Sequence, residues 1–254
     1  MNVVVCAKQI PDPASPGQLE PETKTLVRQD LILDESDMYG VEMALQLIDK
    51  AGGGEVTLVS MAPNNETKGL RSGLAMGAHR AILVSDPGLK GSDALVTAKV
   101  LAAAIKRVEG ADLILAATES TDGYTGTTPV QVAELLGLPS ITFAKHIEVD
   151  GSTVKVQRQT EAGYDEVECP LPCLVTVTAG VVEPRYPSFK GIMAAKSKPL
   201  DELTVSDLGL DGLGVGQEVT DVSPADERKA GEIVEDDGEG HQRIIAFLDN
   251  LKVL

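Results

Sequence analysis

The chain of 254 residues contains no tryptophan, and aromatic side chains make up only 3% of it. Platforms that stack single-stranded nucleic acid bases are built from aromatic side chains, so such a platform is hard to assemble here. Basic residues are outnumbered too, because 22 lysines and arginines face 39 aspartates and glutamates, which gives a formal net charge of −17. Nucleic acid backbones are bound through lysine and arginine, and we therefore expect no nucleic acid partner.

The chain also has few cysteines, and it shows neither a long apolar run nor the features of a signal peptide. The three cysteines (Cys6, Cys169 and Cys173) are an odd number and do not suggest a disulfide framework. No histidine cluster accompanies them, so we expect no metal site. No apolar run approaches the roughly 20 residues that cross a bilayer, which excludes membrane insertion. The opening MNVVVCAKQ lacks the basic region and cleavage site of a signal peptide, and we expect a cytoplasmic protein.

Strand-like and helix-like segments alternate through the first half of the chain. The apolar runs predict strands at residues 3–6, 56–61, 81–85 and 113–116, separated by helices at residues 41–51, 66–76 and 93–108. This alternation is typical of an α/β fold with a doubly wound, mainly parallel sheet. Further strand character is expected at residues 141–149, 153–159, 166–169 and 174–178, and Asp150-Gly151 predicts an added hairpin.

The segment LILAATESTDGYTGTTPVQVAELLGL, residues 113–138, carries the clearest functional signal. A strand runs into a turn with hydroxyl side chains at Ser120, Thr121, Thr125, Thr127 and Thr128 and with glycines at 123 and 126. Pro129 then opens a helix, with Thr128 as its expected cap and with Val132, Leu135 and Leu136 as its expected buried face. Such a turn before a helix is where α/β sheets bind phosphate. Because the turn has no lysine and no general base, it predicts a site that holds a nucleotide without hydrolysing it, and no residue is expected to be catalytic.

Regular patterning fades after Leu200, where an acidic arm is predicted. More than half of the excess negative charge falls in residues 201–254. The arm closes with an amphipathic helical stretch, residues 241–254, whose apolar face includes Ile244, Phe247 and Leu251. A short helix of this kind is marginal by itself, so it should fold back or clasp another subunit. We expect residues 1–200 to form a nucleotide-binding α/β domain and residues 201–254 to form this arm.

Several separate motifs give the chain a family resemblance. They include Cys6-Ala7-Lys8, the Val41-Glu42-x-Ala44 run, the Leu74–Ala78 run, Val156-x-Arg158, Glu183-Pro184-Arg185-Tyr186, and Ile192-Met193-x-Ala195-Lys196. Together they closely resemble the β subunit of electron transfer flavoproteins over about residues 1–200, and the acidic arm is similar in kind.

The resemblance implies an electron-carrier subunit without bond-making chemistry of its own. The family forms an αβ heterodimer in which FAD is held mainly by the α subunit, and the β subunit has an adenine nucleotide alpha-hydrolase-like fold that usually buries AMP. Electrons would arrive from an acyl-CoA dehydrogenase of fatty acid β-oxidation, or from another flavin dehydrogenase, and leave to a quinone oxidoreductase. The arm would contact the α subunit.

The resemblance also implies residues for each site. Carried over by position, the AMP site comprises Cys6, Asp34, Glu35, Ser36, Asp37, Met61, Ala117, Thr118, Asp122, Gly123, Tyr124, Thr125, Gly126, Thr127 and Thr128. Gly123 to Thr128 would surround the phosphate, while Asp34 and Met61 would lie near the ribose or base. The loop from Pro187 to Ala195 would dock dehydrogenases through Phe189, Lys190, Ile192 and Met193, with Lys196 and Lys198 nearby.

Two alternatives stay open at this point. The run Asp122-Gly123-Tyr124-Thr125 matches flavin-bifurcating members of the family in part, so a second FAD or NAD could replace AMP. A nucleotide-binding protein of the universal-stress type would share the fold class. Such proteins are usually shorter and lack both the segment 183–200 and a long acidic arm, which favours the electron carrier.

Overall fold

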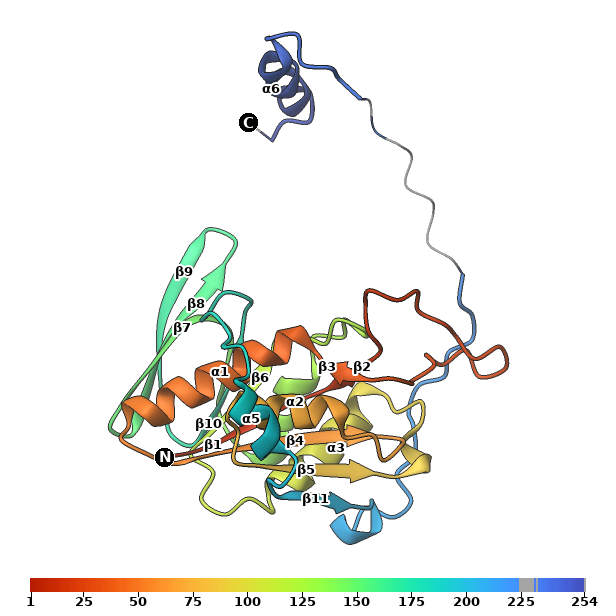
Figure 1. The fold of residues 1–254 in the computed structure, drawn as a ribbon, viewed down its shortest axis with the longest axis vertical. Coiled ribbons are helices and arrows are strands. Elements are labelled where there is room, and N and C mark those ends of the chain that lie inside the picture. Colours follow the sequence, from red (N-terminus) through yellow and green to blue (C-terminus); the bar gives the residue numbers. More distant parts are fainter. Residues whose placement is uncertain (224–230, 232, 254) are drawn as a thin grey trace. The chain divides into compact units, whose positions relative to one another are not determined.

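The computed structural model describes residues 1–223, 231 and 233–253, which fall into two compact units, Met1–Val219 and Thr220–Leu254. The first unit is built around a sheet of nine strands (Figure 1). The strands are β1 (Asn2–Cys6), β4 (Glu55–Ala62), β5 (Arg80–Ser85), β6 (Leu113–Ala117), β7 (Ser140–Asp150), β8 (Thr153–Thr160), β9 (Gly163–Pro170), β10 (Cys173–Val177) and β11 (Leu200–Leu203). Its helices are α1 (Glu35–Lys50), α2 (Lys68–Met76), α3 (Ala94–Ile105), α4 (Thr128–Leu136) and α5 (Phe189–Ala195).

The sheet confirms the predicted doubly wound topology. Its strand order is β11-β5-β4-β1-β6-β10-β7-β8-β9, and the strands from β11 to β7 pair in parallel. The chain winds outward from β1 first through β4 and β5, and then returns to place β6 on the other side of β1. The order therefore reverses between β1 and β6, which is the topological switch point where such sheets bind ligands.

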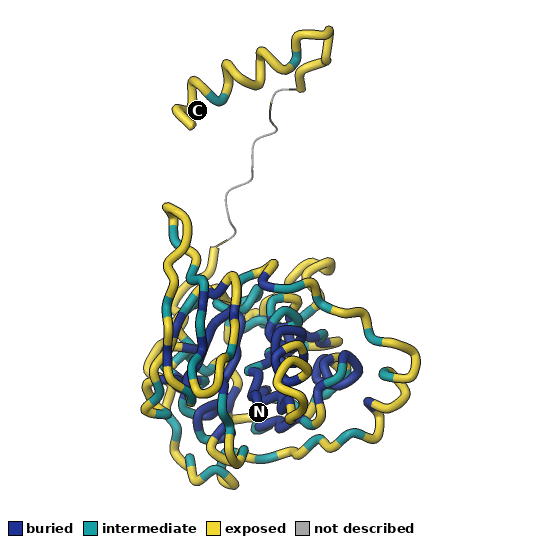
Figure 2. Tube along the Cα trace, turned by 90° about the vertical axis from the view of Figure 1, so that its left-hand side faces the viewer, coloured by how far each residue is buried: buried dark blue, intermediate teal, exposed yellow. Residues whose placement is uncertain are grey.

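Helices pack on both faces of the sheet, and two clusters of buried apolar side chains form its cores. Figure 2 shows that the buried residues lie in the interior of the first unit. Alternate residues of one strand serve opposite cores: Val3 and Val5 pack with α1 and α2, whereas Val4 packs with α3 and α4. The glycines Gly52, Gly53 and Gly54 end α1 and all adopt positive φ, as the stop signal predicts. The predicted hairpin is also confirmed, since β7 and β8 pair in antiparallel fashion around Asp150 and Gly151, and β9 extends it.

Three expectations need correction. The first unit extends to Val219, beyond the boundary expected at Leu200. Strand β11 pairs with β5, Leu208, Leu210 and Leu213 pack against the core that contains α3, and Gly216 N donates a hydrogen bond to Asp93. Helix α4 begins at Thr128, and the residue before it is Thr127, whose side chain does not cap the helix. Leu135 is 37% exposed, because Val132 and Ala133 form the buried side of α4.

The second unit contains helix α6 (Gly240–Asn250), which confirms a helix in the predicted amphipathic stretch. Most of its apolar side chains are exposed, among them Ile244, Ile245 and Phe247, and so is Leu251 directly after the helix. Residues 224–230, 232 and 254 of the expected arm lie outside the described residues. Among the helices that the structure describes, none is long and apolar enough to span a membrane.

Candidate functional site

A cavity of about 680 Å³ lies at the carboxyl ends of the central strands. It is lined by Cys6 at the end of β1, by Met61 and Ala62 at the end of β4, and by Ala116 and Ala117 at the end of β6. This is the switch point of the sheet, and the volume falls in the range of small-molecule sites. The predicted nucleotide turn contributes Ser120, Gly123, Thr125, Gly126 and Thr128 to its wall.

The amino terminus of α4 is the helix end at this cavity that keeps free amides. Thr128 and Pro129 line the cavity, and among the described residues no side chain accepts a hydrogen bond from the amides of Thr128 and Val130, the free donors at this helix end because Pro129 has no amide hydrogen. Gly126, in the turn that leads into α4, has a φ of 65°, a left-handed conformation that favours glycine. Free amides and the helix dipole together attract an anion.

Each of the helices α1, α2 and α3 has one or two of its first amides bound by a side-chain oxygen of the protein itself. Asp34 Oδ1 accepts a hydrogen bond from Ser36 N at 3.0 Å in α1, and Asp93 Oδ1 accepts one from Val96 N at 2.8 Å in α3. In α2, Gln9 Oε1 accepts hydrogen bonds from the amides of Gly69 and Leu70. The start of α4 is therefore where backbone amides are available to a phosphate in this cavity.

Two buried carboxyl groups connect α1 to the strand ends. Asp34 Oδ2 accepts a hydrogen bond from Thr121 N at 2.8 Å, so Asp34 holds the turn before α4 against α1. Asp37 Oδ2 accepts one from Lys8 N at 2.6 Å. Burial raises the pKa of Asp37 to about 8, and the nearby Asp34 adds to this rise. Burial beside Asp37 likewise raises the pKa of the Cys6 thiol to about 12, so Cys6 is a neutral thiol near pH 7.

The structure brings cations to the turn that the sequence prediction missed. Lys8 Nζ lies 3.0 Å from Ser120 Oγ and 2.5 Å from Asp122 Oδ1, and Arg28 Nη2 lies 2.7 Å from Asp122 Oδ2. Although burial alone would raise it, these two cations hold the pKa of Asp122 below its ordinary value. Lys8 lies two residues after the end of β1 and could have been placed at this edge from the strand pattern, whereas Arg28 lies in a long connection that carries no such signal.

The cavity wall as a whole is rich in positive charge for so acidic a chain. Lys8, Lys24, Arg28 and Lys90 all line it. Two of its carboxylates are already engaged, since Asp93 caps α3 and Glu20 lies 3.7 Å from Lys90. Asp37 and Glu119 also line the wall, so it carries as many acidic as basic side chains, whereas acidic residues outnumber basic ones in the chain as a whole. A wall with four basic side chains suits a ligand that carries phosphate.

The residues expected at the AMP site divide into two groups. Those that line the cavity are Cys6, Asp37, Met61, Ala117, Gly123, Thr125, Gly126 and Thr128. Those that lie outside its lining are Asp34, Glu35, Ser36, Thr118, Asp122, Tyr124 and Thr127. In the second group, Asp34 and Asp122 position other residues of the site, and Thr118 Oγ1 donates a hydrogen bond to Val177 O at 3.1 Å.

The expected docking segment is a short helix and not a loop. Ser188 caps α5 by accepting a hydrogen bond from Gly191 N at 3.0 Å, which accounts for the helix. Phe189 is 81% exposed, and Lys190, Ile192 and Met193 are exposed beside it. Lys198 lies apart from this surface, because its Nζ donates hydrogen bonds to Leu74 O and Ala78 O.

A bidentate ion pair holds the chain just before α5. Arg185 Nε and Nη2 lie 2.6 and 3.0 Å from the carboxylate oxygens of Glu42 in α1, and the backbone amide of Arg185 donates a third hydrogen bond to it. Burial would raise the pKa of Glu42, but Arg185 holds it below its ordinary value.

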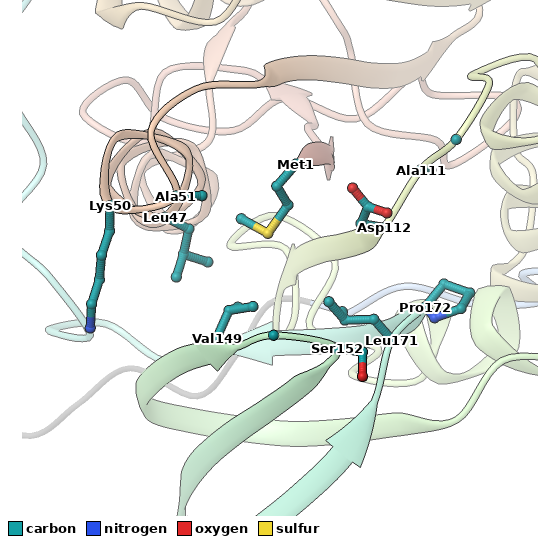
Figure 3. A pocket seen from close by; sticks show the side chains of 12 residues that line it. Met1, Leu47, Lys50, Ala51, Ala111, Asp112, Val149, Ser152, Leu171 and Pro172 are labelled. Atoms are coloured by element: carbon teal, nitrogen blue, oxygen red, sulfur yellow. The ribbon is translucent and has the colours of Figure 1, made fainter.

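A second cavity, of about 710 Å³, lies at the amino-terminal edge of the sheet (Figure 3). It is bordered by Met1, Leu47, Asp112, Val149 and Leu171, and it contains none of the residues expected at a site. Asp112 in its wall is engaged, since it accepts a hydrogen bond from Asn2 N at 2.8 Å. Within the described ranges, no group of three or more potential metal-binding side chains comes together.

The amino-acid sequence is similar to known proteins along its whole length. The sequence profile described as the electron transfer flavoprotein domain matches residues 23–208. The chain belongs to the electron transfer flavoprotein β-subunit family. It is 38% identical to the electron transfer flavoprotein subunit beta of Mycobacterium bovis and 39% identical to that of Mycobacterium leprae, in each case over 100% of this chain and 99% of the relative.

A further member of the family comes from a different kind of complex. The caffeyl-CoA reductase-Etf complex subunit CarD of Acetobacterium woodii is 38% identical over 83% of this chain and 80% of its own length. The turn before α4, the exposed α5 and the Glu42–Arg185 pair therefore belong to an electron transfer flavoprotein fold. Because the chain matches such β subunits over its full length, the universal-stress alternative no longer applies.

Proposed function

We propose that this chain is the β subunit of a heterodimeric electron transfer flavoprotein and that it binds one AMP in the switch-point cavity. The AMP is structural, and a redox-active FAD is held mainly by the α subunit, whose flavin site this chain helps to shape. Because no bond is made or broken by this chain, its role is binding and positioning. The arm with α6 contacts the α subunit through the exposed apolar side chains of that helix.

The observation that carries the AMP proposal is the free amino terminus of α4 inside a cavity with four basic side chains in its wall. The phosphate would accept hydrogen bonds from the backbone amides beside Gly126 and from the hydroxyl of Thr128. The adenosine would lie along the ends of β1 and β4, near Cys6 and Met61. Near pH 7 the raised pKa of Asp37 keeps that carboxyl protonated and neutral, so it does not repel the phosphate.

The proposal continues with electron entry and exit. A flavin dehydrogenase, such as an acyl-CoA dehydrogenase, would dock on α5 through Phe189, Ile192 and Met193 and reduce the FAD, which then passes electrons to a quinone oxidoreductase. A bulky exposed aromatic side chain beside Lys190 suits a transient docking surface.

A second candidate is a subunit that holds another FAD or an NAD in the same cavity. The observation that favours it is that basic side chains line the cavity in a second region, away from the turn before α4. Lys24 and Lys90 belong to this region. A dinucleotide carries two phosphates and could use both regions, whereas AMP needs only the first.

Analysis of the bound nucleotides tests these proposals. The chain should be purified with its α subunit, denatured, and the released compounds quantified by mass spectrometry. The proposal predicts a yellow complex that releases one AMP and one FAD, while this chain alone is colourless. Release of two FAD without AMP would replace it with the second candidate, and the absence of any adenine compound would refute both.

A further inference from the structure

One wall of the cavity is a long connection that covers the site. It comprises residues 11–31, which we call the lid, and it joins the two short strands β2 (Gln9–Ile10) and β3 (Ile32–Leu33). Its cavity-facing residues are Glu20, Lys24, Thr25, Leu26, Val27, Arg28, Gln29 and Leu31. Internal hydrogen bonds from Glu20 N to Thr25 O and from Val27 N to Gln18 O, both 2.9 Å, make the lid a unit with its own shape.

The lid is fixed at its base and exposed at its outer part. At the base, β2 and β3 pair in antiparallel fashion, and Glu66 Oε2 accepts a hydrogen bond from Leu31 N at 3.0 Å. Residues 12–19 are all exposed, so this part buries little apolar surface against the sheet. Segments with few buried contacts open at low free energy, and they are where binding sites find their mobile covers.

Arg28 connects the lid to the nucleotide turn across the cavity. Its Nη2 lies 2.7 Å from Asp122 Oδ2, and its Nη1 donates a hydrogen bond to Gln9 O at 3.3 Å. The Asp122 side chain is 7% exposed and that of Arg28 is 26% exposed, so solvent screens this ion pair less than a surface pair. Lys8 also contacts Asp122 and thereby fixes the carboxylate that receives Arg28.

We propose that the lid controls exchange of the bound nucleotide and that the Arg28–Asp122 ion pair is its latch. The proposal rests on the proposed nucleotide-binding function. Arg28 is a positioning residue in this scheme, because it acts through Asp122 and the lid. Closed, the lid separates the nucleotide from solvent, and opening requires that the ion pair separate first. A hydrogen bond between charged groups is strong enough to set the rate of this step.

The release of radiolabelled AMP from the purified heterodimer measures the latch. Replacing Arg28→Ala should speed release about tenfold to hundredfold, which corresponds to one charged hydrogen bond. Arg28→Lys should give an intermediate rate, since lysine keeps the charge without the planar fork. The matched control is Arg158→Ala, which removes an arginine paired at 3.6 Å with Asp165 on the exposed hairpin and should leave release unchanged.

The variant Asp122→Asn separates a latch from a direct contact between Arg28 and the phosphate. A latch predicts faster release, because the lid loses its partner on the turn. A direct contact predicts slower release, because a negative charge near the phosphate is gone and both cations are freed. Slower release from Asp122→Asn, or unchanged release from Arg28→Ala, would overturn the proposal.

Hydrogen exchange keeps the test independent of the nucleotide assignment. The amides of Glu20 and Val27, which are hydrogen-bonded within the lid, should exchange at least tenfold faster in Arg28→Ala than in the parent heterodimer. If the parent complex holds no adenine nucleotide, the proposed function fails, and faster exchange still supports the latch. Unchanged exchange at both amides would contradict the latch itself.

Discussion

The ion pair between Glu42 and Arg185 allows a prediction whose size and sign both follow from the structure. The Glu42 side chain is 4% exposed and accepts two hydrogen bonds from the guanidinium of Arg185, whose side chain is 41% exposed. The backbone amide of Arg185 and the Gln46 side chain also donate to Glu42, and Arg185→Ala keeps both. Breaking a fully buried pair costs about 3–5 kcal/mol, but solvent around Arg185 reduces this value. We expect Arg185→Ala to lower the local stability of the segment before α5 by about 1.5–3 kcal/mol.

The pH dependence of this loss is also fixed in sign. With Arg185 present, the folded pKa of Glu42 is lowered, so the pair stabilises the fold above the unfolded pKa of about 4.3 and this contribution is lost as pH falls through the folded pKa. Without the Arg185 side chain, the pKa of Glu42 rises, because burial is then opposed only by the hydrogen bonds from Gln46 and from the backbone amide at position 185. The stabilisation that the ionised carboxylate contributes above about pH 4.3 therefore shrinks in Arg185→Ala. The difference between the two proteins should therefore grow from about pH 4 to neutral pH.

Native hydrogen exchange on the purified complex measures this effect locally. The amide of Arg185 donates to Glu42, and in Arg185→Ala the amide at position 185 should exchange about tenfold to hundredfold faster at pH 7 than in the parent. Arg158→Ala serves as the surface control and should change exchange at position 185 by less than about threefold. An unchanged rate at position 185, or a loss that grows toward low pH, would refute the reasoning.

Three further predictions follow from the described contacts. Phe189→Ala should slow dehydrogenase-dependent flavin reduction about tenfold in stopped-flow assays while FAD content stays normal, and unchanged kinetics would contradict the docking assignment. Gly191→Ala places a Cβ 2.5 Å from Ala75 O, so α5 must shift and the free energy of unfolding should fall by about 1–3 kcal/mol, measured as a lower thermal midpoint. The substitution Ala194→Ser at an exposed position of the same helix should have little effect. Folded Asp37 keeps its proton up to a pKa of about 8, so it contributes stability at low pH that declines as pH rises from about 4 to about 8. Asp37→Asn should remove this decline from the free energy of unfolding. Equal pH slopes for the parent and the variant in denaturant unfolding would refute this.

Much of the fold could be predicted because its central strands and helices carry strong patterns. The buried runs of β1, β4, β5 and β6 alternate with amphipathic helices, and glycines mark the end of α1. The missed strands β2, β3 and β11 have only two to four residues each, too few to show a period. The exposure of Leu135 was missed because a helix of nine residues has apolar positions on more than one side, and only packing shows which side is buried.

The site was predictable where it follows from the strand ends and not where it depends on long-range contacts. The turn before α4 was found from its glycines and hydroxyl side chains, and it does line the cavity. Asp34 and Asp122 were expected near the nucleotide, but they lie outside the lining because they bind Thr121, Lys8 and Arg28. These partners are separated by about 90 to 110 residues in sequence, and no local pattern predicts such pairs.

The position of the phosphorus atom tests the central claim most directly. A crystal structure of the purified heterodimer should show one adenosine monophosphate in the switch-point cavity, with phosphate oxygens about 3 Å from the amide nitrogen of Thr128 or Val130 at the start of α4. A phosphate bound instead at the start of α1 or α3, or a switch-point cavity occupied only by solvent, would contradict the account.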